Sequence, residues 1–373
     1  MMRIVPLSDV CDFLDSMRRP VTAKDRVAGV YPYYGANGIL DYVDEYLFDE
    51  DLVLLAEDGG FFDDPKRGVA YRVSGKCWVN NHAHVLRPRK NIDVDYLGYV
   101  LKQYDIRPYI TGATVKKLNQ KAARQIKIPL PSLEEQERIV KILDQVDMLR
   151  QKREQAIKLL DDYLKSVFLE MFGDPVRNPK GWKKKKLGEI TESRLGKMRD
   201  KQYITGKYLE PYLGNSNVKW FYFDLSSLLE MDFDEQEKIR YSLHDGDLLI
   251  CEGGDIGRCA IWRNQLENCY FQKALHRVRT DKRIIIPEYL QWVLFFYSKG
   301  NAFKESRSQA TIAHLTGIKL KRLPVPVAKI DLQNEFAKTI RKTELVKQKM
   351  VAQAEELENQ FQALMQRAFK GQL

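Results

Sequence analysis

One segment of this chain occurs twice. The stretch IPLPSLEEQERIVKIL (residues 128–143) returns in altered form as LPVPVAKIDLQNEFAKTI (residues 323–340). Each copy follows a loop that contains threonine, GATVKKLN (residues 112–119) before the first and SQATIAHLT (residues 308–316) before the second. We call these two segments the Thr loops. A chain that repeats a loop, a strand and the start of a helix builds two similar units, which favours a function that needs two related sites.

A long helix is expected after each copy. Ser132 follows a proline and has Glu135 three residues on, which is a capping-box pattern. No glycine or proline interrupts the chain until Gly173, so residues 131–173 are expected to form one helix that is about 60 Å long. Residues 326–373 contain the second long helix.

Each predicted helix carries a single apolar stripe with a spacing near 3.5 residues. The two stripes share a phase at an offset of 197, which matches Ile139 with Phe336 and Val167 with Leu364. A coiled-coil seam requires this spacing, and the two helices are therefore expected to pack together in antiparallel fashion. The alternative is that each helix packs on its own globular domain.

The globular segments also repeat, although less clearly. DLVLLAEDGG (residues 51–60) matches DLLICEGGDIG (residues 247–257), and NNHAHVLRP (residues 80–88) corresponds to FQKALHRVR (residues 271–279). Each half has short strands separated by turn residues, then one helix, the Thr loop and a further strand. The predicted fold class is α+β, with two mixed domains on two long helices. The expected divisions are residues 1–130, 131–173, 174–325 (linker and second domain) and 326–373.

Charge and cysteine content limit the partners and the compartment. The net charge is +10, and residues 174–330 hold 28 lysines and arginines against 19 acidic residues. This imbalance favours a polyanion such as DNA or RNA, although a solvated lysine-rich surface is the alternative. No apolar run is long enough for a membrane span. Five cysteines without C-x-x-C spacing indicate reduced thiols, and we expect a cytoplasmic protein.

Motifs for catalysis were sought in the sequence. The chain has no G-x-x-x-x-G-K-[ST] phosphate loop, and EGGDIG (residues 252–257) is better interpreted as a tight turn than as a dinucleotide-binding loop. His82 and His84 form H-x-H, but without cysteines or carboxylates at matching spacing they favour a strand or turn over a metal site. The Asn-Pro-Pro-aromatic tetrad of amino-group DNA methyltransferases is also missing. We therefore expect a binding protein with no catalytic residues, bound metal or cofactor of its own.

The order of these elements resembles a known family. The chain has a variable domain, a long helix that opens with IPLPSLEEQERIV, a second variable domain that opens with GWKKKKLGEI (residues 181–190), and a second long helix. This order is similar to that of the specificity subunit of type I restriction–modification systems. The resemblance covers essentially the whole chain. The second copy departs from the P-x-x-E-Q pattern but keeps Gln333, and the N-terminus lacks the tryptophan that usually opens the first domain.

The resemblance implies a division of labour. Each variable domain would be a target-recognition domain that reads one half of a bipartite, asymmetric site on double-stranded DNA, and the helices would set the spacing. Methylation subunits, two of them, would dock on the helices, bind S-adenosylmethionine and methylate adenine, and restriction subunits with motor and nuclease activity could join. Two similar but non-identical domains suit two different half-sites, whereas a symmetric dimer would read a palindrome. The alternatives are a free-standing DNA-binding regulator and a self-sufficient modification enzyme.

Basic and small polar residues in the loops are the candidates for DNA contact. Asparagine, glutamine and arginine can read base edges, whereas lysine and serine mostly position phosphates. In the first half the candidates are Tyr33, Tyr34, Asn37, Asn81, Thr114, Lys116, Lys117 and Asn119. In the second half they are Lys184, Lys185, Asn215, Ser216, Asn217, Lys273, Arg307, Ser308, Gln309, Thr311 and His314. The repeated Gln136 and Gln333 lie in first helical turns, where capping or subunit docking fits them better than DNA contact.

Overall fold

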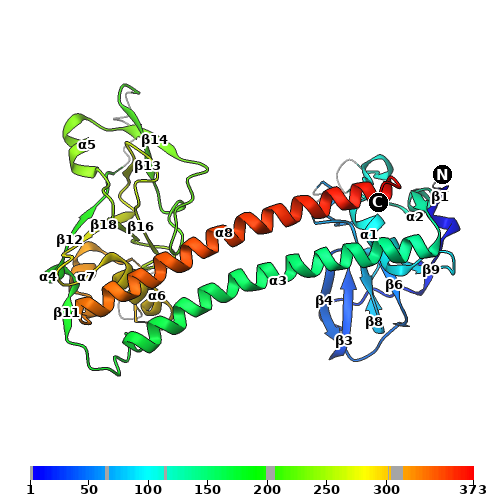
Figure 1. Cartoon of the computed structure of the whole chain (residues 1–373), viewed down its shortest axis with the longest axis horizontal. Coiled ribbons are helices and arrows are strands. Elements are labelled where there is room, and N and C mark those ends of the chain that lie inside the picture. Colours follow the sequence, from blue (N-terminus) through cyan, green and yellow to red (C-terminus); the bar gives the residue numbers. More distant parts are fainter. Residues whose placement is uncertain (1–2, 64–66, 113–115, 199–205, 301, 304–313) are drawn as a thin grey trace. The chain divides into compact units, whose positions relative to one another are not determined.

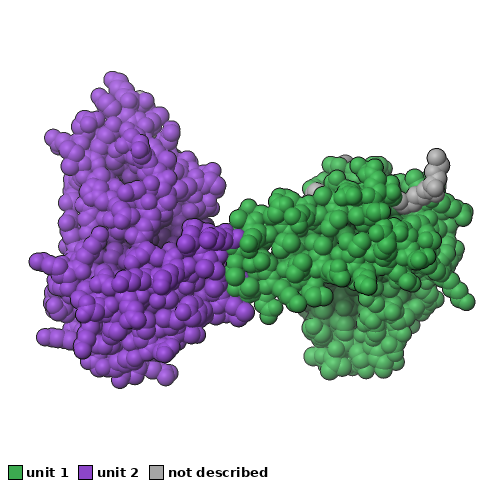
Figure 2. Space-filling view, viewed as in Figure 1, with its two compact units in different colours: residues 1–156, 350–373 green, residues 157–349 purple. Residues whose placement is uncertain are grey.

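The computed structural model describes residues 3–63, 67–112, 116–198, 206–300, 302–303 and 314–373. It confirms the α+β class and the two long helices, α3 (Leu133–Phe172) and α8 (Ile330–Phe369), each of 40 residues (Figure 1). The chain divides into two compact units, which we call unit 1 (Met1–Ala156 with Met350–Leu373) and unit 2 (Ile157–Lys349) (Figure 2). This division differs from the four segments expected from the sequence, because each unit includes about half of each long helix.

The described residues of unit 1 form three small sheets and two short helices besides its parts of α3 and α8. The sheets have the strand orders β1-β10, β2-β9-β6-β7 and β4-β3-β8-β5, and within the third sheet β3 and β8 are parallel. The strand bounds are β1 (Arg3–Pro6), β2 (Cys11–Phe13), β3 (Ala28–Gly35), β4 (Gly38–Val43), β5 (Phe48–Asp49), β6 (Leu52–Ala56), β7 (Ala70–Val73), β8 (Lys76–Val79), β9 (Ala83–Pro88) and β10 (Lys127–Leu130). The helices are α1 (Val94–Gln103) and α2 (Gln120–Arg124), with 3-10 turns η1 (Leu7–Asp9), η2 (Asp15–Met17) and η3 (Arg107–Tyr109).

Unit 2 repeats this topology. Its sheets β11-β19, β12-β18-β15-β16 and β14-β13-β17 correspond in order to those of unit 1, except that among the described residues the third sheet has no counterpart of β5; β13 and β17 again form a parallel pair. The strand bounds are β11 (Lys184–Lys186), β12 (Thr191–Leu195), β13 (Leu209–Leu213), β14 (Leu229–Asp232), β15 (Leu248–Cys251), β16 (Cys259–Ile261), β17 (Tyr270–Phe271), β18 (Leu275–Thr280) and β19 (Pro324–Pro326). The helices are α4 (Leu187–Ile190), α5 (Glu235–Tyr241), α6 (Pro287–Lys299) and α7 (Gly317–Arg322).

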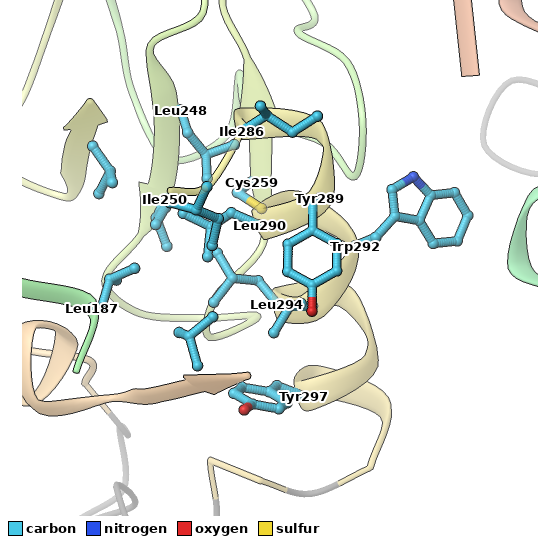
Figure 3. Packing of buried hydrophobic residues seen from close by; sticks show 14 of the residues in the cluster. Leu187, Leu248, Ile250, Cys259, Ile286, Tyr289, Leu290, Trp292, Leu294 and Tyr297 are labelled. Atoms are coloured by element: carbon cyan, nitrogen blue, oxygen red, sulfur yellow. The ribbon is translucent and has the colours of Figure 1, made fainter. Parts of the chain in front are cut away.

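The core of unit 2 lies on both sides of α6. Leu290 and Leu294 face the sheet, where they pack near Ile250 of β15 (Figure 3). Trp292 lies on another face of the same helix, and its ring centroid is 6.1 Å from that of Phe168 on α3. Because α6 is apolar nearly all round, it is buried between the sheet and the long helices.

The long helices pack against each other in antiparallel fashion inside each unit. In unit 1 the start of α3 meets the end of α8, where Arg150 pairs with Glu358 and Ile139 shares a core with Phe361. In unit 2 the order is reversed, since the end of α3 meets the start of α8 and Lys347 lies 2.6 Å from Asp161. Both interpretations of the apolar stripe therefore hold in part, because each helix half packs on its partner helix and on a globular core.

The buried face departs from the predicted stripe near the helix ends. Phe168, Phe172 and Met365 are buried, whereas the predicted Val167 and Leu364 are only half-buried. An α-helix drifts by about 20° per heptad from a 3.5-residue repeat, so a stripe that faces the partner at one point turns away further on. At the ends of the helices, the large aromatic side chains that fill the globular cores decide which face is buried.

Gln136 and Gln333 are internal clamps. In unit 2 the Oε1 atom of Gln333 accepts from the N–H of Ile286 at 3.0 Å, and its Nε2 donates to the carbonyls of Ile284 (3.0 Å) and Ala328 (2.8 Å). Gln136 makes the equivalent three bonds in unit 1. Both side chains are fully buried, so they tie each long helix to the start of α1 or α6 and are not available to a docking subunit.

Within the described ranges, no helix combines the length and the apolar character that a membrane crossing requires.

Candidate nucleic-acid interface

Four turns of unit 1 meet at one edge of its sheets. Backbone and side-chain hydrogen bonds join the turns after β3 and β6, the turn between β8 and β9, and residues 116–119 of the first Thr loop. Asn37 Nδ2 donates to the Gly59 carbonyl at 2.9 Å, the Glu57 N–H donates to the His82 carbonyl at 2.9 Å, and the Leu118 N–H donates to the Glu57 carbonyl at 2.7 Å. We call this set the unit 1 loop cluster.

Unit 2 forms an equivalent set from residues 214–217, 252–257, 272–274 and 314–316, which we call the unit 2 loop cluster. Asn215 Nδ2 donates to the Gly253 carbonyl at 3.3 Å, and the Glu252 N–H donates to the Ala274 carbonyl at 3.0 Å. The Leu315 N–H donates to the Glu252 carbonyl at 2.6 Å. The hydrogen bond from the Leu315 N–H to Glu252 corresponds to that from the Leu118 N–H to Glu57 in unit 1. The described ends of both Thr loops are therefore held in the same way.

Most described candidates of unit 1 lie in its loop cluster and reach the surface. Asn37, Asn81, Lys116 and Lys117 are exposed. Lys116 Nζ lies 2.6 Å from a carboxylate oxygen of Asp63, and Lys117 Nζ lies 2.9 Å from Glu57 Oε1. Asn119 is half-buried and caps α2, because its Oδ1 accepts from the Ala122 N–H at 2.9 Å. Thr114 lies outside the described residues.

Tyr33 and Tyr34 contribute to the fold of β3. Tyr33 is only 1% exposed, and its hydroxyl lies 3.0 Å from the Val21 N–H, which donates to it. Tyr34 is half-buried, with its ring centroid 5.8 Å from that of Tyr71. The expected surface role of Tyr33 is therefore not supported, because its side chain and its hydroxyl are both used inside unit 1.

In the unit 2 loop cluster the exposed candidates are Ser216, Lys273 and His314, and Asn215 is half-buried beside them. Asn217 is 8% exposed and is used internally: its Oδ1 accepts from the Gly214 N–H at 2.9 Å, and its Nδ2 donates to two backbone carbonyls. Asn217 therefore shapes the turn and does not face solvent. Arg307, Ser308, Gln309 and Thr311 lie outside the described residues.

Lys184 and Lys185 are not part of the unit 2 loop cluster. They lie on β11, which pairs with β19. The charge of Lys185 contributes to lowering the pKa of Asp281, after the hydrogen bonds from Arg283. Asp281 follows the last residue of β18, whereas the loop cluster adjoins the first residues of that strand. The six residues of β18 separate the two places by roughly 20 Å at about 3.3 Å per residue.

A buried ionic network, which the sequence did not reveal, supports the unit 1 loop cluster. Arg18 Nη1 donates to Glu57 Oε2 at 2.7 Å, and His84 Nδ1 lies 2.7 Å from Asp15 Oδ2. Burial alone would raise the pKa of Glu57, but hydrogen bonds from Arg18 and Lys117 outweigh it and lower that pKa below its ordinary value. Glu57 is therefore held as a carboxylate beneath the loops.

The same residues were tested as a metal site. Asp15, Glu57 and His84 place ligand atoms within 4.8 Å of one another. Glu57 already contacts a cation at each oxygen, Arg18 at 2.7 Å and Lys117 at 2.9 Å. A metal ion would have to displace these cations, so the chemistry of the group fits an ion-pair network better than a metal centre.

Comparisons with known proteins agree on one family. The family model described as "Type I restriction modification DNA specificity domain" matches residues 2–159 and 179–358. A Haemophilus influenzae protein that bears the name of a type I restriction enzyme specificity subunit is 29% identical over 91% of this chain and 86% of its own length. The EcoKI specificity subunit of Escherichia coli K12 is 26% identical over 87% of this chain and 75% of its own length.

Two solved structures share the fold. The S subunit of a type I restriction–modification system from M. genitalium has a TM-score of 0.59 at 14% identity, covering 99% of this chain and 96% of that one. A structure described in terms of the assembly and conformational transition of the type I restriction–modification system has a TM-score of 0.63 at 16% identity, covering 100% of this chain and 98% of that one.

Proposed function

Because the chain belongs to the family of type I restriction–modification DNA specificity domains, we propose that each of its loop clusters reads one half of a bipartite, asymmetric DNA site. The chain is the specificity component of a restriction–modification complex and contributes recognition, while bond chemistry belongs to other subunits. The observation that carries the proposal is the pair of equivalent loop clusters, one in each unit, built by matching strands but presenting different side chains.

The exposed chemistry of the two clusters supports different readouts. Unit 1 presents Asn37 and Asn81, whose amides can pair with a base edge, beside Lys116. Unit 2 presents Ser216 and Lys273, which suit phosphate or single-bond contacts. Since the exposed residues differ while the backbone bonds beneath them repeat, the two units are suited to different half-sites.

Partner subunits follow from the same proposal. The chain associates with DNA and with methylation and restriction subunits. Two methylation subunits dock along α3 and α8, one for each half-site, and each binds the S-adenosylmethionine that supplies the methyl group. Within each unit α3 and α8 pack together in antiparallel fashion, so each unit offers its own pair of helix segments to one methylation subunit.

A pair of matched lysines tests which surface meets DNA. Lys273→Ala removes an exposed charge within the unit 2 loop cluster, and Lys184→Ala removes one on β11. We expect Lys273→Ala to weaken DNA binding by the assembled complex and to flatten the dependence of log K on log salt by about one, and Lys184→Ala to change neither. If both substitutions weaken DNA binding equally, the DNA interface extends to β11. If Lys273→Ala has no effect on DNA binding, the turn after β17 is not part of the interface.

Exchange of one unit's domain tests the two-half-site reading. Residues 182–322 would be replaced by the matching segment of a relative with a known target, and the methylated motif would be sequenced in a host carrying the complete system. One half of the motif should change and the other half should stay the same. A change in both halves would show a composite site and would contradict the proposal.

A further inference from the structure

A buried histidine lies beneath the end of each Thr loop. His84 on β9 is fully buried, and its Nε2 lies 2.8 Å from the carbonyl oxygen of Leu118. His276 on β18 is 2% exposed, and its Nε2 lies 3.0 Å from the carbonyl oxygen of Leu315. A carbonyl oxygen only accepts hydrogen bonds, so each Nε2 must carry a proton and donate it.

The second ring nitrogen has a different environment in each unit. His84 Nδ1 lies 2.7 Å from Asp15 Oδ2, which also accepts from Gln120 Nε2 at 2.7 Å, while Asp15 Oδ1 accepts from the Val85 N–H at 3.0 Å. Burial raises the pKa of Asp15, but the bonds from His84 and Val85 outweigh it and lower that pKa. Because the Val85 N–H and Gln120 Nε2 can only donate, the geometry favours an ionised Asp15 that accepts from both of them and from His84 Nδ1.

Sheet register explains why, among the described residues of unit 2, no aspartate takes the place of Asp15 beside His276. On β2 the residue Phe13 pairs with Leu86, and two further steps of that register bring Asp15 opposite His84. On β12 the residue opposite His276 is Leu195. Leucine offers no acceptor, so a single proton on Nε2 satisfies His276, and its burial lowers its pKa, against smaller opposing effects of Leu315 and Glu252.

We propose that His84 and His276 are positioning residues for the described ends of the two Thr loops, at Leu118 and Leu315, and that His84 binds its loop end as a doubly protonated cation whereas His276 does so as a neutral ring. Around His84 the charged groups are Asp15 and Arg18 of the η2 segment, Glu57 at 3.6 Å after β6, and Lys117 of the loop. The cation thus joins two carboxylates and two other cations, which makes the unit 1 anchor ionic. The unit 2 anchor rests on a neutral hydrogen bond beside Glu252.

The protonation states can be measured on the full chain without DNA. The chain has five histidines, so imidazole 15N spectra of histidine-labelled protein at pH 7.5 can be assigned by single substitutions. His84 should give two N–H nitrogens and His276 one. Asp15→Asn should convert His84 to a neutral ring that keeps its Nε2 proton. A neutral His84 in the unaltered chain, or a spectrum of His84 that changes on treatment with a chelator, would overturn the ionic anchor.

Amide exchange tests the anchoring itself. In His84→Ala the Leu118 N–H should exchange roughly tenfold faster or more, because a hydrogen bond to a charged group is lost. His84→Gln, whose amide can donate to the same carbonyl, should restore most of the protection. The Leu315 N–H serves as the internal control and should not change. Equal exchange at Leu118 in all three proteins would show that His84 does not hold the loop, whether or not His84→Ala is less stable.

The link to DNA reading rests on the proposed function and is tested separately. In an active complex, His84→Gln and His84→Ala should lower methylation or relax base preference only at the half-site that is unaffected by exchange of residues 182–322. His276→Ala should act on the other half-site. If the ring and exchange results hold but both half-sites respond alike, the anchors are real and the assignment of the loops to separate half-sites is wrong.

Discussion

Replacing Gln333 by leucine should destabilise unit 2 by several kcal/mol. The side chain fits a buried pocket, but leucine cannot bond the N–H of Ile286 or the carbonyls of Ile284 and Ala328. Each buried polar group left without a partner costs about 1–3 kcal/mol, and partial relaxation of the helix start reduces the total. We expect a loss of about 3–6 kcal/mol, which at a urea dependence of about 2 kcal/mol per M shifts the midpoint by about 1.5–3 M.

Tryptophan fluorescence is a suitable assay because the five tryptophans are unevenly distributed. Trp182, Trp220, Trp262 and Trp292 belong to unit 2, whereas Trp78 belongs to unit 1. Fluorescence during urea unfolding therefore follows mainly unit 2, so the loss can be assigned to one unit. Gln348→Leu is the matched control, since Gln348 is an exposed glutamine on the same helix and should change stability by no more than about 0.5 kcal/mol.

Two outcomes would contradict the clamp. If Gln333→Leu and Gln348→Leu unfold at the same urea concentration, the three hydrogen bonds contribute nothing and the argument from buried partners is wrong. If Gln333→Leu keeps full stability but no longer binds methylation subunits, the side chain acts through docking. Gln136→Leu should cause a comparable loss in unit 1, detected as faster amide exchange at Asp93, whose N–H bonds to Gln136 at 2.8 Å.

Three further predictions follow from other parts of the chain. Phe168→Ala should lower the free energy of unfolding of unit 2 by about 3–5 kcal/mol, because Phe168 is fully buried among aromatic rings. Leu169 is 40% exposed on the same helix, so Leu169→Ala should lower it far less, and urea unfolding would distinguish the two variants. Burial lowers the pKa of His276 in the folded chain, so below about pH 6.5 the unfolded chain binds a proton that the folded chain does not bind. The free energy of unfolding is therefore unaffected by this histidine above about pH 6.5 and decreases as the pH falls from there toward the folded-state pKa. In His276→Gln the free energy of unfolding should depend less steeply on pH below about pH 6.5. Four helical residues inserted between Arg150 and Lys158 lengthen α3 by about 6 Å. The unspecified gap between the two halves of the methylated motif should therefore grow by one or two base pairs, at about 3.4 Å each. An unchanged gap with full methylation activity would mean that the helices do not set the gap.

The long helices could be predicted from sequence because their signals are local. Ser132 and Glu135 provide the start of α3, and the Ser132 Oγ does accept from the Glu135 N–H, at 3.3 Å. Gly173 ends the helix with a positive φ of 75°, which glycine adopts at no steric cost. These signals lie within a few residues of the ends they mark, so the expected bounds of α3, residues 131–173, came within two residues of the structure, and the expected segment 326–373 contains α8.

The loop clusters were predictable only in outline. The turns that build them carry glycine and asparagine, which the sequence shows, but the inward or outward direction of a side chain depends on sheet pairing. In YPYYG (residues 31–35) the aromatics suit either face, and the structure buries Tyr33. The contact between Asp15 and His84 joins residues 69 apart, and that between His84 and Leu118 joins residues 34 apart. Such contacts depend on strand register, which a single sequence does not encode in any short window.

The spacing of the repeated anchors shows where the two units diverge. Gln136 and Gln333 are 197 residues apart, and so are Leu118 and Leu315, but His84 and His276 are 192 apart. Unit 2 therefore has five extra residues between the buried histidine and the anchored leucine. Three of them match the greater length of α6, which has 13 residues against 10 in α1. Of the other two, one lies between the histidine and that helix, and one lies in the segment between the helix and the anchored leucine. The anchors can stay in place while this segment changes length, because each anchor bonds to the backbone of its loop and imposes no requirement on the loop's other side chains. A scaffold held in this way allows one unit to acquire a loop of new sequence without disturbing the core beneath it.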